Sequence, residues 1–482
     1  MKKTHSVQTN YFFHTLYQFL TLLTPFITTP YISRVLGPSG VGQYSYYYTL
    51  VQYFVFAGNL GFSSYGQIQI AKVRGNKEAI SKTFWEIFIA RFLSHLVCVV
   101  AYIVLMIFSK NTSMMIVLLG LLISSAIDIS WLYFGLDDFK SISLRNILVK
   151  ILGIVGIFIF VKTSDDTIKY AFILTLSTFM GSLLIWANIK DFVGLPDFRK
   201  YKYRNHIRPA LDFFIPNIAT MIYTMSDKTM IGLITNSDYQ NGLYEQAHKI
   251  EQILVQFLLS ISVVYKSQMA RSFALNDIDT AKKNIKNAMD KILFLSFPIC
   301  FGLISVSRDL VGCFLGTEFN EAQTILCVFS FLVIIVGISN CMSNMYLCVT
   351  DNLKKFQKGV FVGASINVLL NLCMIPFLGA LGASIASVVS EFVILLVLYK
   401  YSKDYYIIND YINTIMKYLF LSVLMFLIIK IETACFLRPY ETKSLIIEIV
   451  TGAVVYISGL VLMKDSVLKD MVLLIKKRMQ KE

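Results

Sequence analysis

The chain has 482 residues, of which 56% are apolar and 15% are charged, and its formal net charge is +14. Soluble domains carry about 25% charged residues, and a soluble fold of this size could not remove so much apolar surface from water. These values indicate a polytopic membrane protein. They exclude a soluble enzyme, a nucleic-acid-binding domain or a disordered scaffold as a description of the whole chain.

Apolar segments recur along the chain, and a helix that crosses a membrane needs about 20 mostly apolar residues. Helices are the expected element because the backbone must satisfy its own hydrogen bonds in lipid. We therefore predict an all-α integral membrane protein with about fourteen transmembrane helices, at 11–33, 41–64, 84–108, 114–136, 144–161, 168–190, 211–234, 246–267, 292–315, 322–348, 359–378, 380–399, 414–433 and 444–463. The tail from Lys464 onward has apolar residues at helical spacing and is predicted to be an amphipathic surface helix.

The distribution of Lys and Arg predicts how these helices are oriented. About three quarters of the 44 Lys and Arg residues lie in segments that share one side of the membrane when the N-terminus is placed inside. Cytoplasmic loops carry this excess of positive charge. Both termini are therefore predicted to be cytoplasmic, and topology explains most of the net charge, so we expect no nucleic-acid partner.

A short sequence echo indicates an internal repeat. The pair Gly42 and Tyr44 returns about 200 residues later as Gly242 and Tyr244, at a matching position near the start of a second block of six helices. Two six-helix blocks enter the membrane in the same direction, which is the plan of a parallel repeat in a two-lobed transporter. We predict an N-terminal lobe over 1–210, a C-terminal lobe over 211–400, and two further helices with a cytoplasmic amphipathic tail over 401–482.

Ionisable side chains inside the predicted helices cost roughly 2.5–3.5 kcal/mol each on insertion scales, so they usually face a cavity or a partner. Arginine and lysine suit phosphate groups, by fork geometry and by point charge respectively. The candidates for a cationic cavity between the lobes are Arg34, Arg91, Lys150, Lys228 and Lys249. The candidates for coupling to an ion are Asp128, Asp227, Glu245, Glu251 and Glu391.

The alternative for each of these charges is that it pairs with a neighbouring helix or reaches the membrane surface. Glu245 and Lys249 are four residues apart and so are spaced to neutralise each other on one helix face. Arg145 lies near the predicted inner end of its helix, and we interpret it as a topology charge.

Sequence motifs of known catalytic sites are absent. The chain has no H-E-x-x-H, no G-x-x-x-x-G-K-[ST] and no G-x-S-x-G, which are typical of zinc proteases, P-loop NTPases and serine hydrolases. The acidic pairs at 137–138 and 165–166 lack a long loop that would hold a sugar donor, and we expect ordinary loop charges there. We therefore expect no enzymatic activity, no metal site and no resident cofactor.

Several motifs resemble those of bacterial Wzx-type polysaccharide-unit flippases, which belong to the multidrug/oligosaccharidyl-lipid/polysaccharide exporter superfamily. The motif P-Y-I-S-R-V-L-G-P-S-G-V-G-Q-Y at Pro30–Tyr44 is similar to the N-terminal signature of that family. The segments Asp128–Phe139, Ser226–Gly232, Gly242–Ile250 and Asn367–Glu391 resemble its fourth helix, the start of its second lobe, and its eleventh and twelfth helices. The resemblance extends over the whole chain.

The resemblance implies a V-shaped bundle of fourteen helices in the bacterial cytoplasmic membrane. It implies translocation of an undecaprenyl-pyrophosphate-linked oligosaccharide repeat unit from the inner to the outer leaflet, for capsule or other polysaccharide synthesis. Alternating access would be driven by Na⁺, H⁺ or the membrane potential. The implied partners are the lipid-linked oligosaccharide, membrane lipids, and the polymerase and other glycan-assembly proteins. By motif, it carries over the polar positions Arg34, Asp128, Lys150, Asp227, Lys228 and Lys249.

Three other functions remain open at this point. A multidrug or cation antiporter of the same superfamily would be expected to have an acidic lumen, which the cationic candidates disfavour. A membrane glycan polymerase would be expected to have a long outer loop, and the predicted outer connections are short. A lipid II flippase is the third alternative; the capsule-type motifs favour a role with glycan repeat units, but they do not identify the substrate.

Overall fold

A computed structural model describes residues 7–197, 201–350, 352–407 and 409–479, which form helices and their connections with no strand among them. The chain forms two compact units. The N-terminal unit consists of Met1–Gly232 with Ser237–Gly242, and the C-terminal unit consists of Leu233–Asn236 with Leu243–Glu482. The all-helical fold predicted from the sequence is therefore confirmed. The predicted lobe boundaries stay predictions.

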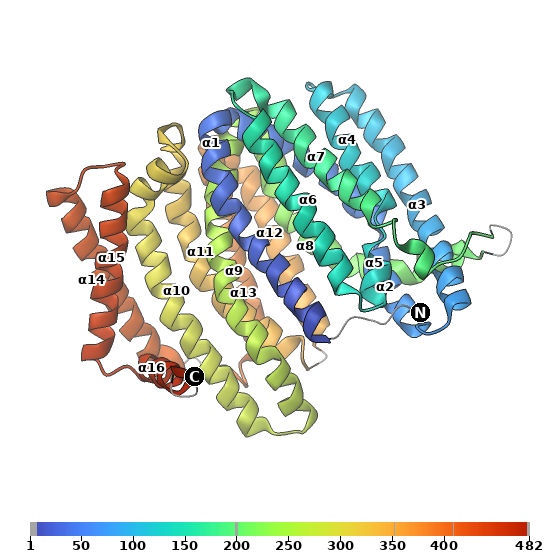
Figure 1. Ribbon diagram of the computed structural model, residues 1–482. Coiled ribbons are helices and arrows are strands. Elements are labelled where there is room, and N and C mark those ends of the chain that lie inside the picture. The colour runs from blue at the N-terminus through green and yellow to red at the C-terminus, as the bar shows by residue number, and fades with distance from the viewer. Residues whose placement is uncertain (1–6, 198–200, 351, 408, 480–482) are drawn as a thin grey trace. The chain divides into compact units, whose positions relative to one another are not determined.

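In the N-terminal unit, α7 packs between α4 and α6, while α1 packs against α3, α4 and α6 (Figure 1). Side chains of Asn76, Asn111 and Asp138 accept hydrogen bonds from backbone N–H groups in the first turns of α3, α4 and α6. These N-caps satisfy donors that have no partner within a helix. The helices of the unit are α1 (Val7–Asn59), α2 (Phe62–Lys72), α3 (Lys77–Ile107), α4 (Thr112–Ile127), α5 (Ser130–Gly135), α6 (Phe139–Phe160), α7 (Thr167–Leu184) and most of α8 (Ile207–Thr235).

The helix α1 is interrupted at Gly37, whose backbone has φ 63° and ψ 179°. Side chains with a Cβ rarely adopt this positive φ, so glycine is the residue that the break requires. Pro38 follows directly and lacks a backbone N–H. The break falls between the first two predicted membrane helices, and α1 carries the first of them and most of the second.

The two glycines of the sequence echo lie against each other in the N-terminal unit. A Cβ on Gly42 would be 1.7 Å from the carbonyl oxygen of Asp238, and a Cβ on Gly242 would be 1.9 Å from that of Pro38. The contact is reciprocal, because Asp238 and Pro38 each precede one of these glycines by four residues. The echo therefore marks two segments in equivalent local surroundings. The parallel repeat of six helices stays a prediction.

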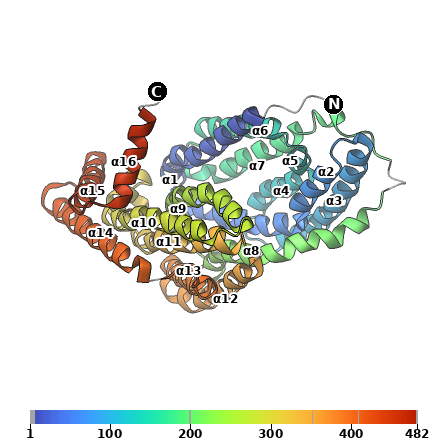
Figure 2. The ribbon, with the colours of Figure 1, turned by 90° about the horizontal axis from the view of Figure 1, so that it is seen from below.

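In the C-terminal unit, α10 packs against α11, α14 and α15, and α13 packs against α11 and α12. Figure 2 shows α14 and α15 beside α10. The helices are most of α9 (Asp238–Ala274), α10 (Ile278–Phe314), α11 (Ala322–Met342), α12 (Leu353–Leu378), α13 (Ala380–Ser402), α14 (Asn409–Phe436), α15 (Thr442–Leu462) and α16 (Ser466–Met479), with a π-helical turn at Ser343–Leu347.

The helix predicted in the tail is present as α16, and residues 480–482 lie outside the described part of the chain. Asp465 precedes α16 and accepts hydrogen bonds from the Leu468 N–H at 2.9 Å and the Tyr418 hydroxyl at 3.1 Å, and it forms an ion pair with Lys417. The start of α16 is thereby tied to α14. Its position at a membrane surface stays a prediction.

Ten helical segments of the described residues are long and apolar enough to cross a membrane. The other four predicted membrane helices lie on α1, the start of α2, α8 and α9. Large apolar side chains such as Val97, Val104 and Ile107 on α3 are exposed, as expected where a helix faces lipid. A multi-pass membrane fold follows, while the number fourteen stays a prediction.

Candidate functional site

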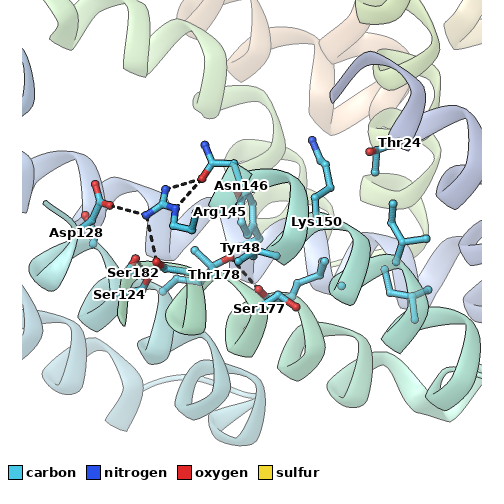
Figure 3. A pocket seen from close by; sticks show the side chains of 18 of the residues that line it. Thr24, Tyr48, Ser124, Asp128, Arg145, Asn146, Lys150, Ser177, Thr178 and Ser182 are labelled. Atoms are coloured by element: carbon cyan, nitrogen blue, oxygen red, sulfur yellow. Dashed lines mark hydrogen bonds and ion pairs between the residues drawn. The ribbon is translucent and has the colours of Figure 1, made fainter. Parts of the chain in front are cut away.

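A cavity of about 630 Å³ lies within the N-terminal unit, lined by residues of α1, α4, α5, α6 and α7 and by Asp128 (Figure 3). This volume is in the range of about 300–1,000 Å³ that is usual for small-molecule sites. Its polar lining combines the cations Arg145 and Lys150 with the carboxylate of Asp128 and several hydroxyl groups. The hydroxyls belong to Thr24, Thr28, Tyr17, Tyr44, Tyr48, Ser124, Ser125, Ser130, Tyr170, Ser177, Thr178 and Ser182.

One face of α6 supplies both cations. Seven residues of this helix line the cavity, at spacings of one and three along the chain: Arg145, Asn146, Val149, Lys150, Gly153, Ile154 and Ile157. Such spacing is the signature of one side of an α-helix. From the sequence, Lys150 was predicted to line the cavity and Arg145 was interpreted as a topology charge. That assignment missed the fact that Arg145 shares the face of Lys150.

The Arg145 guanidinium is held by groups around the cavity. Its Nη1 lies 3.4 Å from the Asp128 carboxylate and donates to the Gly181 carbonyl at 3.2 Å, and its Nε donates to Asn146 at 2.9 Å (Figure 3). Asp128 also accepts a hydrogen bond from Ser130 at 2.6 Å. The two charged side chains keep 15% and 27% of their surface exposed. The cation is therefore oriented but remains accessible from the cavity.

Lys150 has a different environment. Its Nζ donates to the Thr21 hydroxyl at 3.0 Å and lies 5.5 Å from the centre of the Tyr17 ring. A ring face attracts a cation electrostatically. Within the described part of the chain, Lys150 has no carboxylate partner within 4.0 Å. Its charge is thus available to an anionic ligand.

Arg91 does not line this cavity, so the prediction that it contacts substrate receives no support from the geometry. Its side chain is only 2% exposed. It donates to the carbonyl oxygens of Ser125, at 2.8 Å, and Asp128. These carbonyls lie where α4 ends at Ile127, and the last carbonyls of a helix lack partners within it. Arg91 therefore fixes the helix break that positions the Asp128 carboxylate.

The remaining cationic candidates and Asp227 lie outside the lining of this cavity. Arg34 has an exposed side chain on α1. On α8, Asp227 is 5% exposed and Lys228 is half-buried. On α9, Lys249 Nζ lies 3.1 Å from Glu245 Oε1, so these two residues pair as their spacing predicted. The roles of these residues in substrate binding or ion coupling stay predictions.

Two of the acidic candidates, Glu251 and Glu391, belong to the C-terminal unit. Glu251 of α9 is 4% exposed, and its carboxyl group interacts electrostatically with that of Glu391 on α13. The two carboxyl groups therefore repel each other when both are ionised. No group of three or more His, Cys, Asp or Glu side chains among the described residues is placed to hold a metal ion.

Aromatic rings, which were not predicted as site residues, form a further part of the cavity wall. The Tyr44 and Tyr48 rings stack with their centres 5.4 Å apart, and Tyr170 meets Tyr44 edge to face at 4.8 Å. All three residues line the cavity. The site therefore combines cations, hydroxyl groups and ring surfaces, a set suited to an anionic ligand that also carries many hydroxyls.

Comparisons with known proteins give the following relationships. The family described as "Polysaccharide biosynthesis protein" matches residues 7–265. A putative O-antigen transporter of Escherichia coli is 21% identical over 392 residues, which cover 80% of this chain and 94% of the relative. The lipid II flippase MurJ in an inward closed conformation has a similar fold, with a TM-score of 0.78 at 16% identity over 94% of this chain and 98% of that one.

A multidrug resistance MATE family transporter of the MOP superfamily, in an inward-facing conformation, is also similar in fold. Its TM-score is 0.65 at 14% identity, covering 84% of this chain and 96% of that one. With sequence identities of 16% and 14%, these two structures show the fold of this chain alone. Transporters that carry different substrates share that fold.

Proposed function

This chain belongs to the polysaccharide biosynthesis protein family, and we propose that it is a flippase for undecaprenyl-pyrophosphate-linked oligosaccharide repeat units. It would move them from the cytoplasmic to the outer leaflet of a bacterial cytoplasmic membrane, with both of its termini in the cytoplasm. The relatives named as an O-antigen transporter and a lipid II flippase support transport of lipid-linked glycans. They are transporters and not catalysts, which supports a non-enzymatic function.

The observation that carries the proposal is the pair Arg145 and Lys150 on one face of a cavity lined by hydroxyl groups. A pyrophosphate is charged, and moving it unaided through hydrocarbon is prohibitively costly. Arginine can bind phosphate oxygens in a fork, and lysine acts as a point charge. We assign the pyrophosphate to these two cations.

The sugars are assigned to the rest of the wall. Ser177 and Thr178 on α7 lie across from α6 in the cavity (Figure 3), and hydroxyl groups both donate and accept hydrogen bonds. The stacked rings of Tyr44 and Tyr48 offer apolar faces beside them. This wall suits a glycan, whereas a cationic drug would meet two unfavourable positive charges.

Release of the cargo follows from how Arg145 is held. Its ion pair with Asp128 is long, at 3.4 Å, and partly exposed. This separation is longer than the about 2.7–2.9 Å that is usual for a charge-assisted hydrogen bond, so the pair is weaker than a close one. A phosphate can therefore replace Asp128 as the partner of the guanidinium at little cost, and Asp128 can take the guanidinium back when the cargo leaves.

For the energy source, we assign ion coupling to the pair Glu251 and Glu391. Their mutual repulsion supports uptake of a proton or a Na⁺ ion, and the membrane potential can act on that charge. Replacing Glu251 with Gln should abolish the dependence of transport on the coupling ion while substrate binding persists.

The test is depletion of the protein in its host, complementation with variants, and measurement of which leaflet holds the lipid-linked oligosaccharides. Arg145→Met and Lys150→Met should trap complete single units in the inner leaflet. The control is Lys72→Met, which removes one positive charge from an exposed site on α2 outside the cavity. All three proteins should reach the membrane in similar amounts.

Normal flipping by the Arg145→Met/Lys150→Met double variant would overturn the assignment of this cavity. Units that reach the outer leaflet but stay unpolymerised after depletion would indicate a polymerase. Unchanged lipid-linked sugars together with raised drug sensitivity would indicate an antiporter.

A further inference from the structure

A buried histidine lies directly behind the wall of the cavity in the N-terminal unit. His95 of α3 is 0% exposed, and its Nε2 lies 3.0 Å from the hydroxyl oxygen of Ser125, which lines the cavity. Its Nδ1 lies 2.9 Å from the Arg91 carbonyl oxygen. The helix α1 packs closely on the ring, since a Cβ on Gly58 would lie 2.8 Å from His95 Cδ2. His95 is not among the lining residues, so it meets the cavity through Ser125.

The two contacts of His95 determine which ring nitrogen carries the hydrogen. A carbonyl oxygen can only accept, so Nδ1 donates to Arg91. A second positive charge on the ring would be buried one helical turn from the Arg91 guanidinium, without hydration and repelled by it. The ring is therefore neutral, and its Nε2 is an acceptor. The single hydrogen of the Ser125 hydroxyl is donated to Nε2, which leaves the Ser125 oxygen to act as an acceptor toward the cavity.

Other hydroxyl groups of the cavity lining have also donated their hydrogen to the protein. On α1, Thr24 donates to the Leu20 carbonyl at 2.7 Å, and Thr28 donates to the Thr24 carbonyl at 2.9 Å. On α7, Thr178 donates to the Leu174 carbonyl at 2.8 Å. Thr24 and Thr178 are labelled in Figure 3. A hydroxyl oxygen keeps its capacity to accept after its hydrogen is used, so these three side chains also offer acceptors.

The donors of the same cavity are its cations. Lys150 and Arg145 carry hydrogens and no acceptor. Ser130 donates to Asp128 at 2.6 Å, and its oxygen lies 3.4 Å from Nη2 of Arg145, so this hydroxyl accepts from the cation as well. The site therefore has two chemically different parts, which are donating cations on α6 and accepting hydroxyl oxygens on α1, α4 and α7.

We propose that His95 is a positioning residue, which fixes the Ser125 hydroxyl as an acceptor and thereby completes an acceptor wall. This wall consists of Ser125, Thr24, Thr28 and Thr178, and it selects the O–H and N–H groups of the sugar next to the pyrophosphate. A carboxylate has oxygens that can only accept, so a uronic acid in this place would meet lone pairs. The proposal rests on the proposed function, because it takes a lipid-linked glycan as the cargo.

Binding of synthetic probes to the purified protein in lipid nanodiscs tests the acceptor wall. The probes are polyprenyl pyrophosphate alone, polyprenyl-pyrophosphate-linked glucose, and the four analogues of the latter with one sugar hydroxyl replaced by fluorine. Fluorine is close to a hydroxyl in size but has no hydrogen to donate. We expect the glucose probe to bind about threefold to tenfold more tightly than at least one fluorinated analogue, as the loss of one hydrogen bond predicts.

Variants then test the role of His95. In Ser125→Ala and in His95→Phe, the preference for glucose over the fluorinated analogue should disappear at one ring position, while the affinity for polyprenyl pyrophosphate alone stays at the wild-type value. His95→Gln should keep the preference, because its amide oxygen can accept the Ser125 hydrogen. The matched control is Ser64→Ala, which removes an exposed hydroxyl of α2 outside the cavity and should bind every probe as the wild type does.

The outcomes separate this inference from the function on which it rests. Equal wild-type affinities for glucose and all four fluorinated probes would overturn the acceptor wall and leave the flippase assignment standing. A preference that persists in both Ser125→Ala and His95→Phe, or that is lost equally in His95→Gln and His95→Phe, would overturn the positioning role. Absence of binding of any probe would overturn the proposed function together with this inference.

The position of the hydrogen on His95 can also be measured without a ligand. Nitrogen-15 NMR of histidine-labelled protein distinguishes a ring nitrogen that carries hydrogen from one that does not, and the His95 signals are those that His95→Phe removes. We expect a hydrogen on Nδ1 and none on Nε2 at neutral pH. A hydrogen on Nε2 would overturn the proposal, because the Ser125 hydroxyl would then keep its own hydrogen for the cavity.

Discussion

Replacing Gly242 with alanine tests the close backbone contact between the segments that contain Gly42 and Gly242. The new methyl group would lie 1.9 Å from the Pro38 carbonyl oxygen. Carbon and oxygen atoms in favourable contact are about 3.3–3.6 Å apart. The two segments would therefore have to separate by about 1.5 Å. Overpacking of this kind typically costs about 1–3 kcal/mol, and occasionally more.

The control for this prediction is Gly302→Ala in α10, where the nearest atom to the new Cβ is the terminal methyl of Met425 at 3.5 Å. Both substitutions gain about 1 kcal/mol of helix propensity, so this term largely cancels between them. The difference in unfolding free energy between the two variants should then equal the overpacking cost, about 1–3 kcal/mol.

Thermal unfolding of the purified proteins in one detergent measures this difference. We expect Gly302→Ala to melt at or above the wild-type temperature and Gly242→Ala several degrees below it. Gly42→Ala should behave like Gly242→Ala, and the double variant should cost less than the two single variants together, because both disrupt one contact. A Gly242→Ala protein as stable as Gly302→Ala would refute the reciprocal glycine contact.

Three further predictions concern other contacts. Arg91→Met should lower stability and impair export together, because each buried carbonyl left without a donor costs about 1–3 kcal/mol; export lost at unchanged melting temperature would instead indicate contact with the cargo. Burial raises the pKa of Asp465, but the ion pair with Lys417 and the hydrogen bonds to the carboxylate outweigh burial and hold that pKa below its usual value. The contribution of Asp465 to stability is therefore present at neutral pH and is lost as the pH falls through the lowered pKa. An acid-unfolding profile should show less of this loss in Lys417→Met. Hydrogen bonds from Thr280 lower the pKa of Asp277, so Asp277→Ala should lower the melting temperature slightly at neutral pH and have less effect in acid.

The membrane class and the helical fold could be predicted from the sequence because they depend on quantities that are local along the chain. A run of apolar residues must bury itself in lipid whatever its neighbours are, and the backbone then has to be helical. The i, i+4 pair of Glu245 and Lys249 was predictable for the same reason, because a single helix brings both residues together. The repeat of Gly42 as Gly242 was visible in the sequence, but the contact between the two segments was not.

The roles of two arginines show what the sequence left undetermined. Both Arg91 and Arg145 were visible as charges near or within predicted helices. Arg91 was predicted to line the cavity, and Arg145 was interpreted as a topology charge. In the fold, Arg91 donates to carbonyl oxygens at the end of α4, while Arg145 shares a cavity-lining face with Lys150. The roles of both residues toward a substrate stay predictions. Helical periodicity states which residues share a face, but not which helix that face meets. The sequence by itself determined that this is a helical membrane protein with costly embedded charges. Only the tertiary structure placed Arg91 against the carbonyl end of α4 and Arg145 in the cavity wall, because these contacts join helices that are distant along the chain.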